Sequence, residues 1–154
     1  MIFGCTGTQE AMRKLIASIR GDLGKARNAN ELAAAEADVS VCEGVDAYSR
    51  KDRAAAVDKL LPWRGNAYRA LGAGDAQRDV IGIMLGQAAL KGGKHHIASA
   101  IFAQRIDAKA NNEMSWTWFA DTLSHSGHDK AAQQARLRAQ QIVNELRVAA
   151  RGAS

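Results

Sequence analysis

A spacing of 34 residues, shared by several small and apolar side chains, most constrains what this chain can fold into. Gly93 recurs as Gly127 and Ala98 recurs as Ala132, each 34 residues later. Leu85-Gly86 precedes the first copy in the same way as Phe119-Ala120 precedes the second. Repeats of this length are helix–turn–helix units, with small residues where the two helices pack and glycine in the turn. The sequence therefore predicts stacked pairs of helices.

The composition is consistent with an all-helical chain. Of the 154 residues, 47% are hydrophobic, and the chain has a single proline. Strand-forming residues are scattered, and no alternation of apolar and polar residues persists. We therefore expect an all-α fold, a right-handed α–α superhelix (a helical-repeat solenoid) of about seven helices. A chain of this length is expected to form one domain, residues 1–154.

Glycine, proline and capping residues divide the chain into units. We expect a half repeat over residues 8–20, and helix pairs over 30–71, 75–109 and 113–150. The last helix extends beyond its repeat, as helices that cap a solenoid often do. Asn28 or Asn30 is expected to cap the helix that follows, Gly44 to lie where two helices cross closely, and Pro62 to end or kink its helix. Gln77-Arg78-Asp79 is interpreted as a capping and ion-pairing turn, with a polar anchor as the alternative.

Three phrases resemble the tetratricopeptide repeat (TPR) protein 38-like family, over the C-terminal portion of its longer members. They are Leu60-Leu61-Pro62-Trp63-Arg64, the run from Gly72 to Val80, and Ala88-Ala89-Leu90. The 34-residue spacing is also the tetratricopeptide period. The chain departs from the family at Ala73, Asp75 and Ile81, where glycine, His or Asn, and Phe are typical. The resemblance implies a TPR-like helical-repeat scaffold without catalytic residues to assign.

Repeat scaffolds commonly bind other proteins along a concave face, which the first helix of each pair lines. Such a groove suits an amphipathic helix or an extended peptide. The first prediction is therefore a non-enzymatic scaffold that binds a protein or peptide partner. By helical register, the groove residues are Val41, Val45, Tyr48, Val80, Ile83, Gln87, Leu90, Met114, Thr117, Asp121 and Ser124.

The half repeat near the N-terminus predicts self-association. Its apolar stripe, at helical spacing, is Met12, Leu15, Ile16 and Ile19. A repeat unit exposes an apolar face unless something covers it, and twofold dimers are the commonest oligomers. We expect a homodimer through this stripe. In the alternative, the helix folds back into the concave groove and leaves a monomer.

Four histidines support an alternative function. His95 and His96 lie in one predicted turn, and His125 and His128 lie in the next. Stacked repeats place successive turns on one edge, so these side chains are a candidate zinc, nickel or copper site. The competing interpretation is that they are ordinary polar residues of exposed turns, and no metal cofactor is expected.

A second alternative is a basic module that binds nucleic acid. The net charge is +5, and basic residues gather near both ends of the chain. Nucleic-acid surfaces place such charge on one face, together with stacking aromatic residues. Here the aromatic residues occupy packing positions, so a solvated helix face is the favoured interpretation. The two basic groups are Arg13, Lys14, Arg20, Lys25 and Arg27, and Lys130, Arg136, Arg138, Arg147 and Arg151.

Other function classes lack their motifs. The chain has neither a glycine-rich nucleophile turn nor a phosphate-binding loop, so we expect no enzyme. Charged residues and glycines interrupt every apolar run, which argues against a membrane partner. The segment from Met1 to Cys5 lacks the basic start of a signal peptide. With only Cys5 and Cys42, a reduced cytoplasmic setting is expected, and Cys42 is interpreted as a small packing residue.

Overall fold

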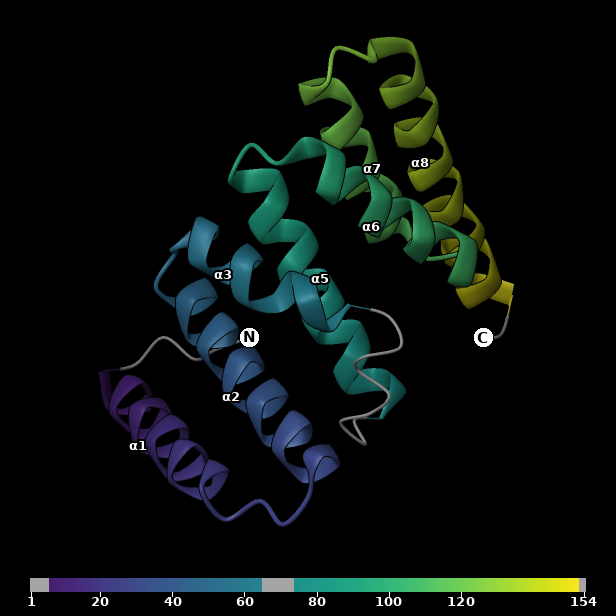
Figure 1. Cartoon of the computed structure of the whole chain (residues 1–154). Helices are drawn as coiled ribbons and strands as arrows, with labels where there is room; N and C mark the ends of the chain where they lie inside the picture. The colour runs from purple at the N-terminus through teal and green to yellow at the C-terminus, as the bar shows by residue number, and fades with distance from the viewer. Residues whose placement is uncertain (1–5, 65–73, 153–154) are drawn as a thin grey trace. The chain divides into compact units, whose positions relative to one another are not determined.

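The chain folds into helices alone over the part that the computed structural model describes, residues 6–64 and 74–152. The prediction of an all-α fold with about seven helices is confirmed for these residues. The elements are drawn in Figure 1. They are α1 (Thr6–Leu23), α2 (Ala29–Ser49), α3 (Arg53–Leu60), the short 3-10 helix η1 (Leu61–Trp63), α5 (Asp75–Lys91), α6 (His95–Ala108), α7 (Glu113–His125) and α8 (Asp129–Gly152).

The chain divides into two compact units. Unit 1 is formed by residues 1–88 and unit 2 by residues 89–154. The boundary falls near the end of α5, inside the expected second helix pair. In unit 1, α1 packs on α2 and α2 packs on α3, and in unit 2, α6 packs on α7 and α7 packs on α8.

The expected helix pairs match the observed helices closely at most boundaries. One correction concerns the half repeat, which was expected over residues 8–20. The helix α1 instead runs from Thr6 to Leu23, through Gly21. Glycine in a helix costs only about 1 kcal/mol relative to alanine, so it does not by itself end one. Residues 65–71 of the expected first pair lie outside the described residues.

Side-chain caps begin three of the helices. The Oδ1 atom of Asn28 accepts a hydrogen bond from the Glu31 backbone N–H at the start of α2. The side chains of Asp52 and Asn112 do the same for α3 and α7. At the start of α5, the Gly74 N–H donates to the Gln77 side chain at 3.0 Å. These bonds satisfy amide groups that a helix leaves unpaired in its first turn.

The turn inside each helix pair has the same conformation. One residue has positive φ in each turn, namely Lys51 (65°), Gly93 (73°) and Gly127 (77°). The following residue donates its N–H to the carbonyl five positions earlier, and the positive-φ residue donates to the carbonyl three positions earlier. This pattern is the Schellman motif that ends many helices. The 34-residue repeat of Gly93 and Gly127 is therefore also a repeat of backbone geometry, and the first pair shares it without a glycine.

The helices α2 and α3 approach closely at Gly44. A Cβ atom at this position would lie 2.5 Å from the Leu60 Cδ2 atom, well inside van der Waals contact. Leu60 and Ala56 of α3 are fully buried. The expected role of Gly44 at a close helix crossing is thus confirmed. Pro62 lies in η1, directly after α3 ends at Leu60, as the sequence predicted.

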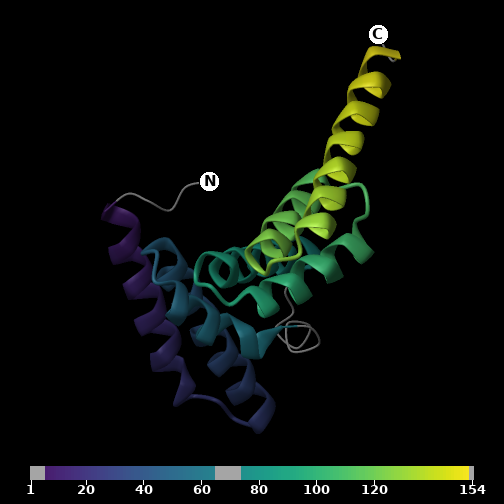
Figure 2. The ribbon, with the colours of Figure 1, turned by 90° about the horizontal axis from the view of Figure 1, so that it is seen from above.

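Unit 2 has a core of small residues packed around Phe102. The Phe102 and Trp118 rings lie 5.5 Å apart between centroids, tilted by 37°. The helix α8 buries Ala132, Ala135 and Ile142, and its second half extends beyond α6 and α7 (Figure 2). Leu146, in the second half of α8, is 60% exposed. Within unit 2, the last part of α8 therefore does not cover the core.

We predict that Gly44→Ala destabilises the fold by about 1–3 kcal/mol, because the added methyl displaces buried Leu60. The matched control is Gly82→Ala in α5, where the described residues place no atom within 4 Å of the new Cβ. Alanine is the better helix former, so this control is expected to gain about 0.5–1 kcal/mol. Urea unfolding followed by circular dichroism measures both changes. Equal effects of the two substitutions would contradict the close crossing.

Candidate functional site

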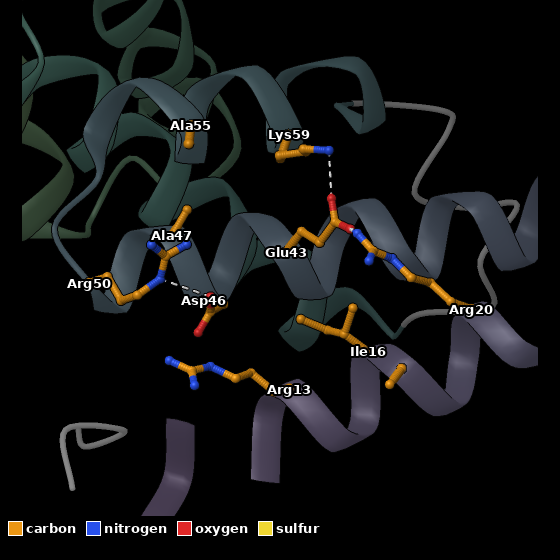
Figure 3. Close-up of a pocket in the computed structure, with 10 residues that line it drawn as sticks. Arg13, Ile16, Arg20, Glu43, Asp46, Ala47, Arg50, Ala55 and Lys59 are labelled. Carbon is orange, nitrogen blue, oxygen red and sulfur yellow. Dashed lines mark hydrogen bonds and ion pairs between the residues drawn. The ribbon is translucent and has the colours of Figure 1, made fainter. Parts of the chain in front are cut away.

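A cleft with charged walls lies among α1, α2 and α3 of unit 1 (Figure 3). Its volume is about 410 Å³, which is within the range of small-molecule pockets. The apolar floor includes Ile16 and Ala47, which are both buried. The other apolar lining residues are Ala17, which is exposed, and Ala55, which is half-buried. The charged side chains around it are Arg13, Arg20, Glu43, Asp46, Arg50 and Lys59.

Two helical stripes with the same spacing form most of this cleft. On α1 the lining residues are Arg13, Ile16, Ala17 and Arg20. On α2 they are Glu43, Asp46, Ala47 and Arg50. Both sets follow the spacing i, i+3, i+4, i+7, which places residues on one face of a helix. The α1 stripe therefore contributes the pair Ile16 and Ala17 to the cleft, and the α2 stripe contributes Ala47 among three charged residues.

Glu43 joins all three helices of the cleft. Its carboxylate accepts a hydrogen bond from Arg20 of α1 and lies 2.5 Å from the Lys59 Nζ atom of α3. The side chain is 15% exposed. Burial favours the protonated form, but the hydrogen bonds and charges of Lys59 and Arg20 outweigh it and hold the Glu43 pKa below its usual value of 4.5. The Ser40 hydroxyl adds a hydrogen bond to the Lys59 carbonyl oxygen.

The other end of the cleft has unequal charges. The Arg50 Nε atom lies 2.9 Å from the Asp46 carboxylate, one turn away on the same helix. Arg13 approaches this end from α1 in Figure 3, and no ion pair joins it to any residue that the structure describes. The six charged groups comprise four cations and two carboxylates, so the cleft carries a net charge of 4 − 2 = +2. Its electrostatics favour an anionic group.

A second, apolar groove lies elsewhere in unit 1. Its volume is about 350 Å³, and it lies between Val45 of α2 and the first turns of α5. The α5 residues are Ala76, Gln77, Val80, Ile81 and Met84. Val80 is 49% exposed. This groove includes Val45 and Val80, two of the residues that helical register assigned to a binding face.

The other predicted groove residues of unit 1 have varied surroundings. Val41 and Ile83 are half-buried. The Tyr48 ring is covered by Arg53, whose guanidinium carbon lies 5.1 Å from the ring centroid. Gln87 is buried, and its Nε2 atom has no hydrogen-bond partner among the described residues. Register therefore placed these residues on α2 and α5 correctly but did not reveal which of them line a groove.

The remaining predicted groove residues belong to unit 2. Leu90 is half-buried, and Met114 is exposed. The Thr117 hydroxyl donates to the Glu113 carbonyl oxygen of its own helix, and Asp121 pairs with Arg136 of α8 at 3.5 Å. Ser124 is half-buried. None of these five residues is among those that line the apolar groove of unit 1.

The structure brings together two of the four predicted histidines. The His95 and His125 rings stack with 5.2 Å between their centroids. The His125 Nδ1 atom lies 2.7 Å from the Asp121 carbonyl oxygen. His96 and His128 are exposed. No three His, Cys, Asp or Glu side chains of residues 6–64 and 74–152 are grouped closely enough to hold a metal ion.

Most basic side chains near the N-terminus have a carboxylate partner. Lys14 pairs with Glu10, Lys25 with Asp22 and Arg27 with Glu31, all within a turn. Arg136 and Arg138 of α8 also pair, with Asp121 and Glu145. These basic residues therefore do not form one field of uncompensated charge of the kind that nucleic acid requires.

Cys42 of α2 is a partly buried thiol. Burial raises its pKa, and the negative charges of Asp38 and Glu43 raise it further. Because the thiolate is the reactive form, this environment favours the unreactive thiol. The interpretation of Cys42 as a packing residue fits this environment.

Comparisons with known proteins do not assign a function to either site. No protein-family model, curated protein or solved structure matches the chain. Among the described helices, none is both long and apolar enough to cross a membrane.

We predict that Glu43→Gln destabilises unit 1 by about 1–3 kcal/mol at neutral pH, because the cations of Arg20 and Lys59 lose their mostly buried, ionised acceptor. The folded-state pKa of Glu43 is lowered, so its contribution is full above pH 4.5 and is lost as the pH falls through the folded-state pKa. The difference in unfolding free energy between wild type and variant should therefore shrink in acid.

The matched control for this prediction is Glu10→Gln, which removes an exposed pair with Lys14 on α1 alone. Such pairs contribute about 0.5 kcal/mol or less. Denaturant unfolding at several pH values measures both variants. A stability difference for Glu43→Gln that stays constant down to pH 2 would contradict the assigned pairing. An effect that depends on the charge of Glu43 should disappear once the carboxyl group is protonated, because it is then uncharged like glutamine.

Proposed function

We propose that this chain is a non-enzymatic helical-repeat scaffold of the tetratricopeptide type that binds a protein or peptide partner. The observation that carries the proposal is the exposed apolar groove between Val45 and the first turns of α5. Its occupant is an amphipathic helix or peptide that inserts an apolar side chain beside Val80.

Repetition in the backbone supports the scaffold. The turn hydrogen bonds Lys94 N–H to Ala89 and His128 N–H to Leu123 measure 2.8 and 2.9 Å and are separated by 34 residues. Ala98 and Ala132, one turn further on, are both fully buried, as is Ala56 at the matching place in α3. A repeat architecture presents its surfaces by stacking such units. Three helix pairs with one turn geometry fit this architecture.

The chemistry of the groove supports a protein partner. Five of its six lining residues are apolar, and the sixth, Gln77, uses its side-chain oxygen to cap α5. Exposed apolar grooves with a polar rim are typical of helix-in-groove recognition. Arg78 and Asp75 form an ion pair at the start of the same helix.

We predict that Val80→Glu abolishes partner binding, because it places a carboxylate in the apolar groove. Val80 is already 49% exposed, so the fold should tolerate the change. The control is Leu137→Glu on α8, which introduces the same side chain at a 58% exposed position. The measurement is affinity capture from the native host with wild type and both variants, quantified by mass spectrometry.

The expected result is one set of captured proteins that is lost with Val80→Glu and kept with Leu137→Glu. Circular dichroism confirms that each variant is folded. Equal capture by all three proteins would contradict binding in this groove. Loss with both variants would mean that the captured proteins respond to added charge rather than to the groove.

Self-association through α1 is a second proposed function. Ile16 is buried and faces the cleft on α2, while Leu15 is 48% exposed, and Met12 and Ile19 are half-buried. The chain itself therefore buries Ile16 of this stripe and leaves the Leu15 side chain exposed to solvent. A second copy that covers Leu15 removes this apolar surface from water. Such burial stabilises the dimer by about 25 cal/mol for each Å² of apolar surface.

We predict a dimer that Leu15→Glu converts to a monomer, because the substitution places charge at the centre of the contact. Multi-angle light scattering at micromolar concentration, repeated after dilution, measures the mass. Lys14→Glu, one residue away, serves as the control for added negative charge. A monomeric wild type at every concentration would rule out the dimer but not the groove.

A further inference from the structure

We propose that the charged cleft of unit 1 binds a small organic anion, a carboxylate or phosphate group attached to an apolar body. Arg13 is the residue that anchors the anion. The cleft lies among α1, α2 and α3 and is separate from the apolar groove at Val45 and Val80. This inference is therefore independent of the proposed protein-binding function.

The charge balance determines the sign of the ligand. Glu43 interacts with both Arg20 and Lys59, so one carboxylate serves two cations. Asp46 is paired with Arg50 at 2.9 Å, and Arg13 adds a further positive charge. The net charge of 4 − 2 = +2 over these groups leaves room for an anion with one or two negative charges. A cation would meet a net positive charge and is disfavoured by repulsion.

Arg13 is the side chain that a ligand can use without breaking an existing ion pair. Figure 3 shows it extending from α1 toward the end of the cleft where Asp46 and Arg50 lie. Among the described residues it forms no ion pair, whereas Arg20, Arg50 and Lys59 each form one. A guanidinium group presents parallel N–H donors that match the two oxygens of a carboxylate or phosphate.

The floor of the cleft determines the rest of the ligand. Ile16 and Ala47 are buried beneath the charged rim, with Ala17 and Ala55 beside them. A bare inorganic anion would leave these apolar atoms without a partner, whereas an aromatic or aliphatic body covers them. The volume of about 410 Å³ accommodates a small organic molecule, and pockets of this size with a few placed polar groups are typical ligand sites.

The test is a nuclear magnetic resonance titration of the full chain at fixed ionic strength, with backbone amides as reporters. The probes are phenyl phosphate and benzoate, which share an apolar ring and differ in the oxyanion. Benzyl alcohol is the neutral control, and inorganic phosphate tests the oxyanion alone.

The expected result is a saturable shift of cleft amides on α1, α2 and α3 with at least one organic anion. Benzyl alcohol and inorganic phosphate are expected to bind at least tenfold more weakly. The stronger of the two organic probes identifies the oxyanion.

Two variants assign the binding to Arg13. Arg13→Gln should lower the affinity for the organic anion about tenfold, which is the typical loss when a charge-assisted hydrogen bond is removed. Lys14→Gln removes the same charge from the next residue, whose ammonium pairs with Glu10, and should change the affinity less than twofold. Circular dichroism checks that both variants fold.

Three outcomes would overturn the proposal. The first is the absence of saturable shifts in the cleft with either organic anion. The second is equal weakening by Arg13→Gln and Lys14→Gln, which would mean general attraction to a basic chain. The third is binding of benzyl alcohol as tight as that of benzoate, which would mean that charge does not select the ligand.

Discussion

The close crossing of α2 and α3 at Gly44 is the constraint on which the rest of unit 1 depends. Because Gly44 lacks a side chain, Leu60 packs directly against the α2 backbone. The neighbouring residues in sequence, Glu43 and Lys59, are thereby brought within ion-pair distance. Arg20 of α1 binds the same carboxylate. One small residue thus positions the charged group that joins three helices, and the cleft exists because these helices are held at that spacing.

Much of this fold could be predicted from the sequence, because the features that specify it are local. The Asn28 cap and Pro62 each act within one helix or one turn, and Gly93 and Gly127 each occupy a single turn. The turn at Lys51 shows the limit of this approach. It has the same hydrogen bonds as the turns at Gly93 and Gly127, but a lysine with positive φ gives no sequence signal. The exposure of Leu146 was also not predictable, because periodicity identifies an apolar stripe but not how far its neighbour extends.

The two candidate sites of unit 1 also differ in how much of them could be predicted from the sequence. Helical register predicted Val45 and Val80 as residues of a binding face, and in the structure both line one groove. The charged cleft was missed, although its stripes from Arg13 to Arg20 and from Glu43 to Arg50 share one helical spacing. The sequence gives no signal that the stripe on α1 packs against the stripe on α2. The contact of Arg20 with Glu43 joins residues 23 positions apart, and charge patterns on one helix do not reveal such partners. Both sites in unit 1 depend on α2, since it contributes Val45 to one and Glu43 to the other.

Hydrogen exchange of the Arg20→Gln variant most directly tests the claim that Glu43 holds α1 on the α2–α3 pair. The substitution removes the contact to α1 and leaves the Lys59 contact in place. Exchange at neutral pH should then quicken in the amides of α1 and stay unchanged around Gly44 and Leu60, because the α2–α3 crossing does not need Arg20. Equal loss of protection in α1, α2 and α3 would contradict this account, as would a wild-type rate throughout α1.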